Sequence, residues 1–361
     1  MGLGARRPYI DWTRGVAVLL MIEAHVFDAW TSVADRSGFA YRNLMILGGF
    51  AAPLFLWLAG LAGVLSAERT LRKTGSRRDA GFALCRRGAE VLLLAFLFRI
   101  QAFVVSPGKP AVSILRVDIL NVLGPSLMLV AILWLVVRSR TAAVAAFAAG
   151  ALLFSLITPW IRSAGWVDGL PPLFQWYLRP AGTHTTFTVF PWTGFSLAGA
   201  ALGAIIAWAG SQKSEAAVQA GAFAIGLVLL AAGFYGAYNA PLFGDAAFWT
   251  TSPEFFVIRI GVMMATLAVM YALELALGRR EVWLTPLAKL GQASLFVYWI
   301  HVEMVYGYLS WPIRRRLDLP QAVFAYVAFC GLMYGAILLR DRLMRRRDDG
   351  RRMERPVVAR A

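Results

Sequence analysis

The chain has 361 residues, of which 59% are hydrophobic and 16% charged, and its mean hydropathy is +0.62. A soluble domain carries about 25% charged residues, so this composition excludes an ordinary soluble protein and favours an integral membrane protein. The formal charge of +16 does not indicate nucleic-acid binding, because the basic residues lie in short segments between apolar runs and form no basic face interleaved with aromatic residues.

Apolar runs long enough to cross a bilayer recur along the whole chain. We therefore predict an all-α fold, a polytopic bundle of about ten transmembrane helices over residues 1–340, followed by a basic cytoplasmic tail over 341–361. The predicted spans lie at roughly 9–30, 42–66, 81–105, 113–137, 141–161, 187–208, 216–237, 255–277, 286–310 and 320–340.

The basic residues predict the topology of these spans. One side holds most of the basic residues: Arg6 and Arg7, the segment 68–79, Arg138 and Arg140, Lys213, Arg279 and Arg280, and the tail after residue 340. The opposite side is poor in basic residues apart from Arg314–Arg316. Short cytoplasmic loops are enriched in Lys and Arg, so both termini are predicted to be cytoplasmic. We expect a multi-pass protein of the bacterial inner (plasma) membrane.

The first predicted span is unusual because it carries five ionisable side chains. At about 100° per residue, Asp11, Arg14, His25 and Asp28 share one helix face, whereas Glu23 points nearly the opposite way. A charge near the bilayer centre costs at least about 2.5–3.5 kcal/mol on insertion scales, so the polar face must point into the bundle or towards water. It is either a structural network, with Arg14 neutralising Asp11, or a chemical site in which His25 accepts and donates a proton.

A second histidine is predicted at a similar depth. His301 lies about 18 Å along a helix from Lys289, and His25 lies about 21 Å along a helix from Asp11. A lone histidine in a membrane helix can be a satisfied helix–helix contact, and the alternative is a role beside His25.

Two further polar clusters each have a structural and a functional interpretation. Arg116, Asp118 and Asn121, near the external start of the fourth span, form either a structural Arg–Asp pair or a substrate-orienting group. Arg86 and Arg87, near the cytoplasmic start of the third span, either anchor the helix or hold phosphates of a cytoplasmic acyl donor, for which guanidinium groups are well suited.

The two long external loops, about 162–186 and 238–254, carry less information. The first is rich in Trp, Pro and Gly, and it either rests at the membrane interface or covers a site from outside. Its His184 is predicted to be a solvated loop residue. Cys85 and Cys330 fall inside predicted spans, and no residue spacing predicts a metal site.

The opening "IDWTRGVAVLLMIEAH" resembles that of the transmembrane acyltransferases, which include acyltransferase family 3 and the heparan-α-glucosaminide N-acetyltransferase-like proteins. In acyltransferase family 3 an Arg and a His with ten residues between them mark the first helix, as Arg14 and His25 do here. The animal glucosaminide acetyltransferases lack a His at this position, so their glycosaminoglycan substrate does not carry over. Further segments are similar, in order, to later spans of the family: "FAAPLFLWLAGLAGVLSAER", "CRRGAEVLLLAF", "LRVDILNVLGPSLMLVAILWL", "FPWTGFSLAGAALG" and "TPLAKLGQASLFVYWIHVEMVYGYL".

The resemblance implies transfer of an acyl group, acetyl in the first instance, from cytoplasmic acetyl-CoA to a hydroxyl or amine of a sugar-containing acceptor, with no metal. The expected partners are acyl-CoA, this acceptor and membrane lipid, without nucleic acid; a homo-oligomer is left open. The predicted site residues are His25, His301 and Asp28 for catalysis, Arg14, Arg86 and Arg87 for donor binding, and Asp11, Arg116, Asp118 and Asn121 for binding or orienting the acceptor.

Two other classes of protein fit parts of the sequence. A transporter or channel would use the buried polar face as a path for ions or substrate, and it would move substrate without consuming CoA. A non-catalytic lipid-binding scaffold fits the composition but leaves the buried charges unexplained.

Overall fold

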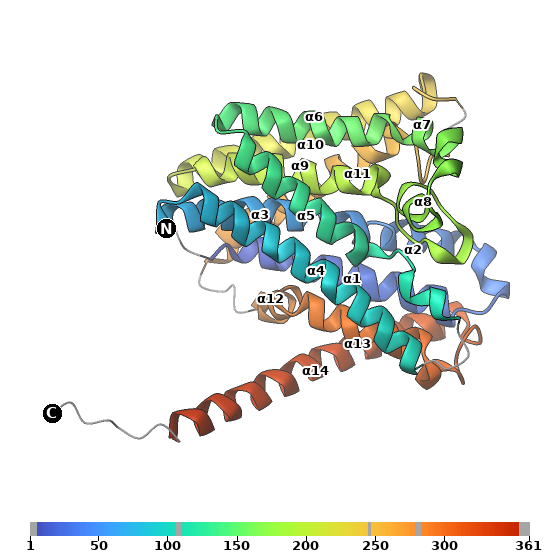
Figure 1. Ribbon diagram of the computed structural model, residues 1–361. Coiled ribbons are helices and arrows are strands. Elements are labelled where there is room, and N and C mark those ends of the chain that lie inside the picture. Colours follow the sequence, from blue (N-terminus) through green and yellow to red (C-terminus); the bar gives the residue numbers. More distant parts are fainter. Residues whose placement is uncertain (1–5, 106–109, 245–246, 279–282, 354–361) are drawn as a thin grey trace. The chain divides into compact units, whose positions relative to one another are not determined.

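The computed structural model describes residues 6–105, 110–244, 247–278 and 283–353, with side chains to residue 346. These residues are almost wholly helical, and no strand occurs among them (Figure 1). The helices are α1 (Pro8–Trp30), α2 (Phe39–Gly48), α3 (Ala51–Thr74), α4 (Arg77–Val105), α5 (Ile119–Val136), α6 (Arg140–Leu156), α7 (Thr158–Ser163), α8 (Pro172–Leu178), α9 (Val189–Trp208), α10 (Gln212–Asn239), α11 (Pro253–Leu277), α12 (Thr285–Gln292), α13 (Ser294–Tyr306) and α14 (Leu319–Met353).

The helices confirm the all-α membrane fold. Each predicted span contains a helix, and within the described residues eight helical segments are long and apolar enough to cross a membrane. Two of the predicted spans are not among these eight: α1, with its charged residues, and the pair α12 and α13, which is broken at Ala293. They are the helices that carry His25 and His301, so the two predicted spans with the weakest membrane signal are also the two with a histidine.

Two connections differ from the sequence-based expectation. The predicted loop 68–79 is a tight turn, because α3 continues to Thr74 and α4 begins at Arg77. Gly75 makes this turn with a φ of 70°, a left-handed conformation that glycine adopts without steric cost. At the other end of the chain α14 continues to Met353, past the predicted boundary at residue 340.

The chain divides into two compact units. Unit 1 comprises Met1–Thr13 and Phe50–Gly278, and unit 2 comprises Arg14–Gly49 and Arg279–Ala361. Helix α1 runs continuously from unit 1 into unit 2, which holds both His25 and His301. The division into a membrane domain and a tail stays a prediction.

Close helix packing in unit 1 depends on small residues. Ser196 of α9 donates a hydrogen bond to the carbonyl of Leu56 in α3, with 3.0 Å between Oγ and O. A Cβ atom added at Gly199 of α9 would lie 2.7 Å from the carbonyl carbon of Trp57, and one at Gly60 of α3 would meet Ser196 in the same way. Small residues allow helix backbones to approach closely in a membrane, where association depends on van der Waals contact.

Gly199→Ala should therefore force α3 and α9 apart and destabilise the protein by about 1–3 kcal/mol. The measurement is the Tm of purified protein in detergent. Gly221→Ala is the matched control, because a Cβ at this exposed position of α10 meets nothing within 4 Å. Equal Tm values for the two variants would contradict the close-packing account.

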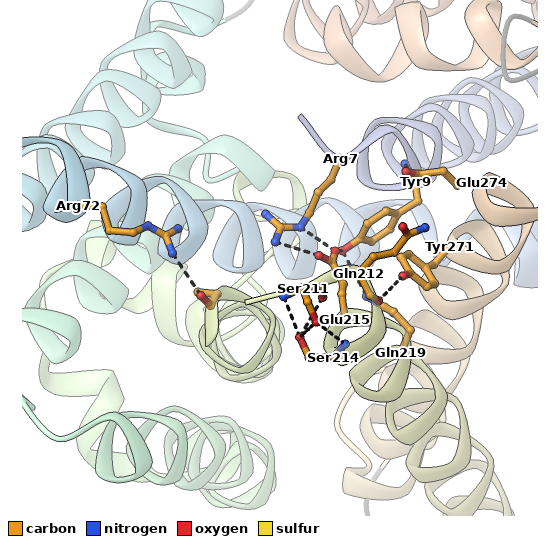
Figure 2. A network of polar contacts seen from close by, with 11 residues as sticks. Arg7, Tyr9, Arg72, Ser211, Gln212, Ser214, Glu215, Gln219, Tyr271 and Glu274 are labelled. Atoms are coloured by element: carbon orange, nitrogen blue, oxygen red, sulfur yellow. Dashed lines mark hydrogen bonds and ion pairs between the residues drawn. The ribbon is translucent and has the colours of Figure 1, made fainter. Parts of the chain in front are cut away.

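The N-terminal segment is fastened to the ends of α10 and α11 within unit 1 (Figure 2). Arg7 donates two hydrogen bonds to the Glu215 carboxylate, at 2.7 and 3.1 Å, and the Tyr9 hydroxyl donates a third at 2.7 Å. The Tyr9 backbone N–H donates to Glu274 at 2.9 Å, and Gln219 donates to the Tyr9 hydroxyl at 3.2 Å. Burial alone would lower the pKa of Arg7, but the hydrogen bonds and charge of Glu215 outweigh it and raise the pKa.

This network brings together segments that the basic residues assigned to one membrane side, namely the N-terminus, the start of α10 and the end of α11. Arg72 near the end of α3 also donates to the carbonyl of Ala207 near the end of α9, at 3.4 Å (Figure 2). The grouping supports the predicted topology within unit 1, and the cytoplasmic location of that side stays a prediction.

Labelling of single cysteines tests which side is cytoplasmic. In a background with Cys85 and Cys330 replaced by alanine, Thr74→Cys should be protected from an impermeant maleimide added to intact cells. Gly169→Cys, in the predicted external loop, should react. Labelling of Thr74→Cys from outside would reverse the topology.

Candidate active site

The two histidines of the predicted site are in direct contact within unit 2. Nδ1 of His25 on α1 lies 2.7 Å from Nε2 of His301 on α13. The rings are nearly parallel, with centroids 5.0 Å apart and planes 13° apart. His301 is fully buried, whereas His25 is partly exposed.

The hydrogen bonds indicate which nitrogens carry protons. Nδ1 of His301 lies 2.8 Å from the carbonyl oxygen of Val297, and a carbonyl can only accept, so this nitrogen is the donor. Burial of an uncompensated cation is costly, which favours a neutral His301 whose Nε2 accepts from Nδ1–H of His25. A neutral His25 then carries its lone pair on Nε2, which is the form a general base or nucleophile requires.

The contact depends on how α12 and α13 run beside α1. Gly15 of α1 lies against Leu287 of α12, so closely that a Cβ at Gly15 would overlap the Leu287 side chain. From this contact to the histidine pair, α1 advances ten residues and the α12–α13 segment fourteen. Unbroken helices of those lengths would rise about 15 and 21 Å. The longer segment is not one regular helix, because α12 ends at Gln292 and α13 begins at Ser294, with Ala293 between them.

A second contact holds the far end of the two helices. The indole N–H of Trp30, at the end of α1, donates to the carbonyl of Val305 at 3.1 Å, and the Ser310 hydroxyl donates to the same carbonyl at 2.6 Å. The histidine pair is thus held between two fixed contacts, one on each side along the helix axes.

Asp28 belongs to this cluster but contacts other residues. Its Oδ2 accepts from the hydroxyl of Tyr306 at 2.8 Å, its Oδ1 lies 3.7 Å from the Arg36 guanidinium, and its backbone carbonyl accepts from Arg36 as well. The Tyr306 ring meets the His25 ring edge-on, with centroids 5.5 Å apart. Asp28 therefore positions Tyr306 beside His25, and its predicted catalytic part stays a prediction.

Sequence reasoning missed Tyr306 as a member of the site. It follows His301 by five positions, which on a regular helix turns the side chain about 140° away. Periodicity along α13 therefore separates the two residues, and only the approach of α1 brings both to His25.

The other predicted residues of α1 lie far from the histidine pair. Arg14 is half-buried and about 16 Å before His25 along the helix. Asp11 is further away still, belongs to unit 1, and accepts from Nε of Arg6 at 2.7 Å. Neither side chain touches His25 at that separation, so any role for them is at a distance from the reacting groups.

The predicted donor-binding arginines Arg86 and Arg87 are exposed on α4. Both donate to the Glu90 carboxylate, at 3.0 and 3.4 Å. Since α4 begins at Arg77, they lie about 14 Å along the helix, and their place near the cytoplasmic start of the span stays a prediction. Their role in donor binding stays a prediction.

The polar residues before α5 also pair differently from expectation. Asp118 forms an ion pair with Arg99 of α4, not with Arg116, and it caps α5 in a capping box with Asn121. Arg116 instead donates to the Thr186 hydroxyl at 2.8 Å. These contacts provide a structural reason for the cluster, and its acceptor-orienting role stays a prediction.

His184 is not simply a solvated loop residue. Its ring stacks on that of Trp176 in α8, with centroids 4.4 Å apart and planes 6° apart, and it is half-buried.

Residues 6–237 match the model of the family described as heparan-alpha-glucosaminide N-acetyltransferase, catalytic. The match covers well over half of the chain. The chain belongs to this family. It is thus an integral membrane acetyltransferase, and of the two groups that its opening resembles, the match supports the glucosaminide acetyltransferases. The matched residues include His25 and end before His301. No curated protein matches the chain.

Proposed function

We propose that the protein transfers an acetyl group from cytoplasmic acetyl-CoA to a hydroxyl or amine of a sugar-containing acceptor on the other side of the plasma (inner) membrane. The contact that carries this proposal is the hydrogen bond from Nδ1 of His25 to Nε2 of His301. Family membership provides the reaction class, and this hydrogen bond provides a histidine with a lone pair on its remaining ring nitrogen.

His25 can act by either of two balanced routes. As a general base, its Nε2 takes the proton of the acceptor hydroxyl or amine while that group attacks the thioester carbonyl. The C–S bond then breaks, and the CoA thiolate leaves and receives the proton. As a nucleophile, Nε2 attacks the thioester carbonyl, the C–S bond breaks and CoA leaves as a thiolate. The acceptor then attacks the acetyl-imidazole, the C–N bond to Nε2 breaks, and the proton of the acceptor neutralises the thiolate. His301 stabilises either route, because its Nε2 accepts the Nδ1 proton of His25.

Arg14 lies on the same face of α1, nearer the predicted cytoplasmic end. A guanidinium there suits the phosphates of an acyl donor that enters from the cytoplasm. In this proposal the polar face of α1 extends from a donor region at Arg14 to the reacting groups at His25.

The direct test uses purified protein in nanodiscs with labelled acetyl-CoA and D-glucosamine as the first acceptor, and it measures CoA release and label transfer. Transfer with equal CoA release supports the proposal. If the protein in proteoliposomes moves solute without consuming acetyl-CoA, the transporter alternative is correct instead.

His25→Ala should lower the rate of acetyl transfer by at least about 100-fold, which is the contribution expected of a general base. The chain has three histidines, so His184→Ala is a matched control that should retain activity. Both variants should match the unmodified protein in Tm and in gel-filtration behaviour. Near-normal turnover by a folded His25→Ala protein would eliminate the mechanism.

Arg14→Ala and His301→Ala should affect different kinetic constants. Arg14→Ala removes a donor contact and should raise the KM for acetyl-CoA about tenfold with little change in kcat. His301→Ala removes the group that orients His25 and should lower kcat. His301→Gln, which retains a hydrogen-bonding side chain, should recover part of the turnover. Arg86→Ala tests the competing donor site. If Arg14→Ala leaves the KM unchanged, Arg14 has a structural role.

A further inference from the structure

Three consecutive arginines, Arg314–Arg316, are the exception to the charge distribution of this chain. They lie between α13 and α14 on the predicted external side, where basic residues are otherwise sparse. All three side chains are exposed. They belong to unit 2, together with His25 and His301.

Backbone hydrogen bonds hold this segment against the end of α1. The N–H groups of Arg315 and Arg316 donate to the carbonyls of Ala29 and Trp30, at 3.0 and 3.1 Å, and Leu317 donates to Trp30 at 3.0 Å. Helix ends leave their last carbonyls without partners inside the helix, and these donors satisfy two of them. Ala29 is one turn beyond His25, a rise of about 6 Å, so the arginines are fixed close to the candidate active site.

Arg315 has a strained backbone. Its φ is 56°, the only positive value among the non-glycine residues that the structure describes. Glycine adopts this conformation without steric cost, and a long side chain does not. Strained residues persist where the surrounding structure imposes them, and they cluster at binding and catalytic sites.

The positive charge of the segment is not neutralised by nearby acids. Within the described part of the chain no ion pair joins Arg314–Arg316 to a carboxylate, and the one side-chain hydrogen bond runs from Arg316 to the carbonyl of Pro312, at 3.2 Å. The neighbouring Asp318 caps the start of α14, where it accepts from the N–H of Gln321 at 2.8 Å.

The charge of Arg315 also lies near Tyr41 of α2. It acts on the hydroxyl of Tyr41 together with the charges of Arg36 and Asp28. Arg36 lies 5.9 Å above the Tyr41 ring and is already paired with Asp28. Arg315 is thus a second cation near Tyr41, besides Arg36, and among the described residues it forms no ion pair.

We propose that Arg315, assisted by Arg316, binds a negatively charged group of the acceptor, such as a phosphate or carboxylate carried on its sugar. This inference rests on the proposed function and assigns the acceptor a chemical class. A guanidinium binds such groups through paired, charge-assisted hydrogen bonds. The short rise from His25 to Ala29 matches the size of one sugar, whose reacting hydroxyl or amine would lie at His25 while its anionic group is held at Arg315.

The test compares D-glucosamine with D-glucosamine 6-phosphate as acceptors in phosphatidylcholine nanodiscs. Arg315→Asn removes the charge while keeping a residue that tolerates positive φ. It should raise the KM for the phosphorylated sugar about tenfold, with unchanged kcat, and alter the KM for glucosamine less than about twofold. Arg315→Lys should retain most of the preference. Arg345→Asn, at an exposed position near the other end of α14, is the matched control and should change neither KM.

A second arm measures binding by calorimetry without acetyl-CoA. Glucosamine 6-phosphate should bind the unaltered protein and Arg345→Asn alike, and Arg315→Asn more weakly. Loss of binding in Arg315→Asn supports the anion site even if no acetyl group is transferred, in which case the proposed function fails by itself. Transfer with equal KM values for both sugars overturns the anion site alone.

Anionic lipid has the same chemistry as the proposed ligand and needs its own arm. The assays are repeated in nanodiscs that contain phosphatidylglycerol. If Arg315→Asn loses activity towards both sugars, and does so only with phosphatidylglycerol present, the arginines bind lipid headgroups and the acceptor proposal is overturned. An unchanged preference for the phosphorylated sugar in both lipids supports it.

Discussion

The hydrogen bond between His25 and His301 is the interaction on which the candidate active site depends. It joins residues 276 positions apart, and it forms only because α12 and α13 follow α1 closely. The glycine at position 15 allows that approach, and Trp30 holds the far end through the carbonyl of Val305. Between these two contacts the α12–α13 segment is interrupted at Ala293.

Charged side chains buried in a membrane protein need partners of opposite charge, and most of those described here have one. Arg99 is paired with Asp118, and Arg36 with Asp28. The side chains of Arg259 and Glu23 do not follow this pattern. Arg259 of α11 lies 3.9 Å above the ring of Phe255 in a cation–π contact, and no ion pair joins it to a carboxylate within the described part of the chain. The Glu23 carboxylate is enclosed without a hydrogen-bond partner among the described residues. It points away from the histidine pair, so burial of Glu23 does not serve the chemistry of His25.

The proposed function gives a reason why one helix carries so many ionisable residues. As proposed, acetyl transfer across a membrane needs a cation near an anionic donor, a base near the acceptor, and a proton path that avoids lipid. Arg14 and His25 share a face of α1, and His301 accepts from the base within the protein interior. Asp28 accepts from Tyr306, whose ring meets that of His25. Apart from Glu23, the ionisable residues of α1, which would be costly against lipid, thus share one helix face.

Local properties of the sequence determined the helices, the polar face of α1 and the similar depth of the two histidines, because hydropathy and helical phase depend only on neighbouring residues. Pairing depends on which helices meet, and only the tertiary structure decided it. Asp118 lies beside Arg116 in the sequence but pairs with Arg99, since α4 and α5 are neighbours. Tyr306 joins His25 for the same reason. A helix face can be read from spacing, but the residues it faces are set by long-range packing.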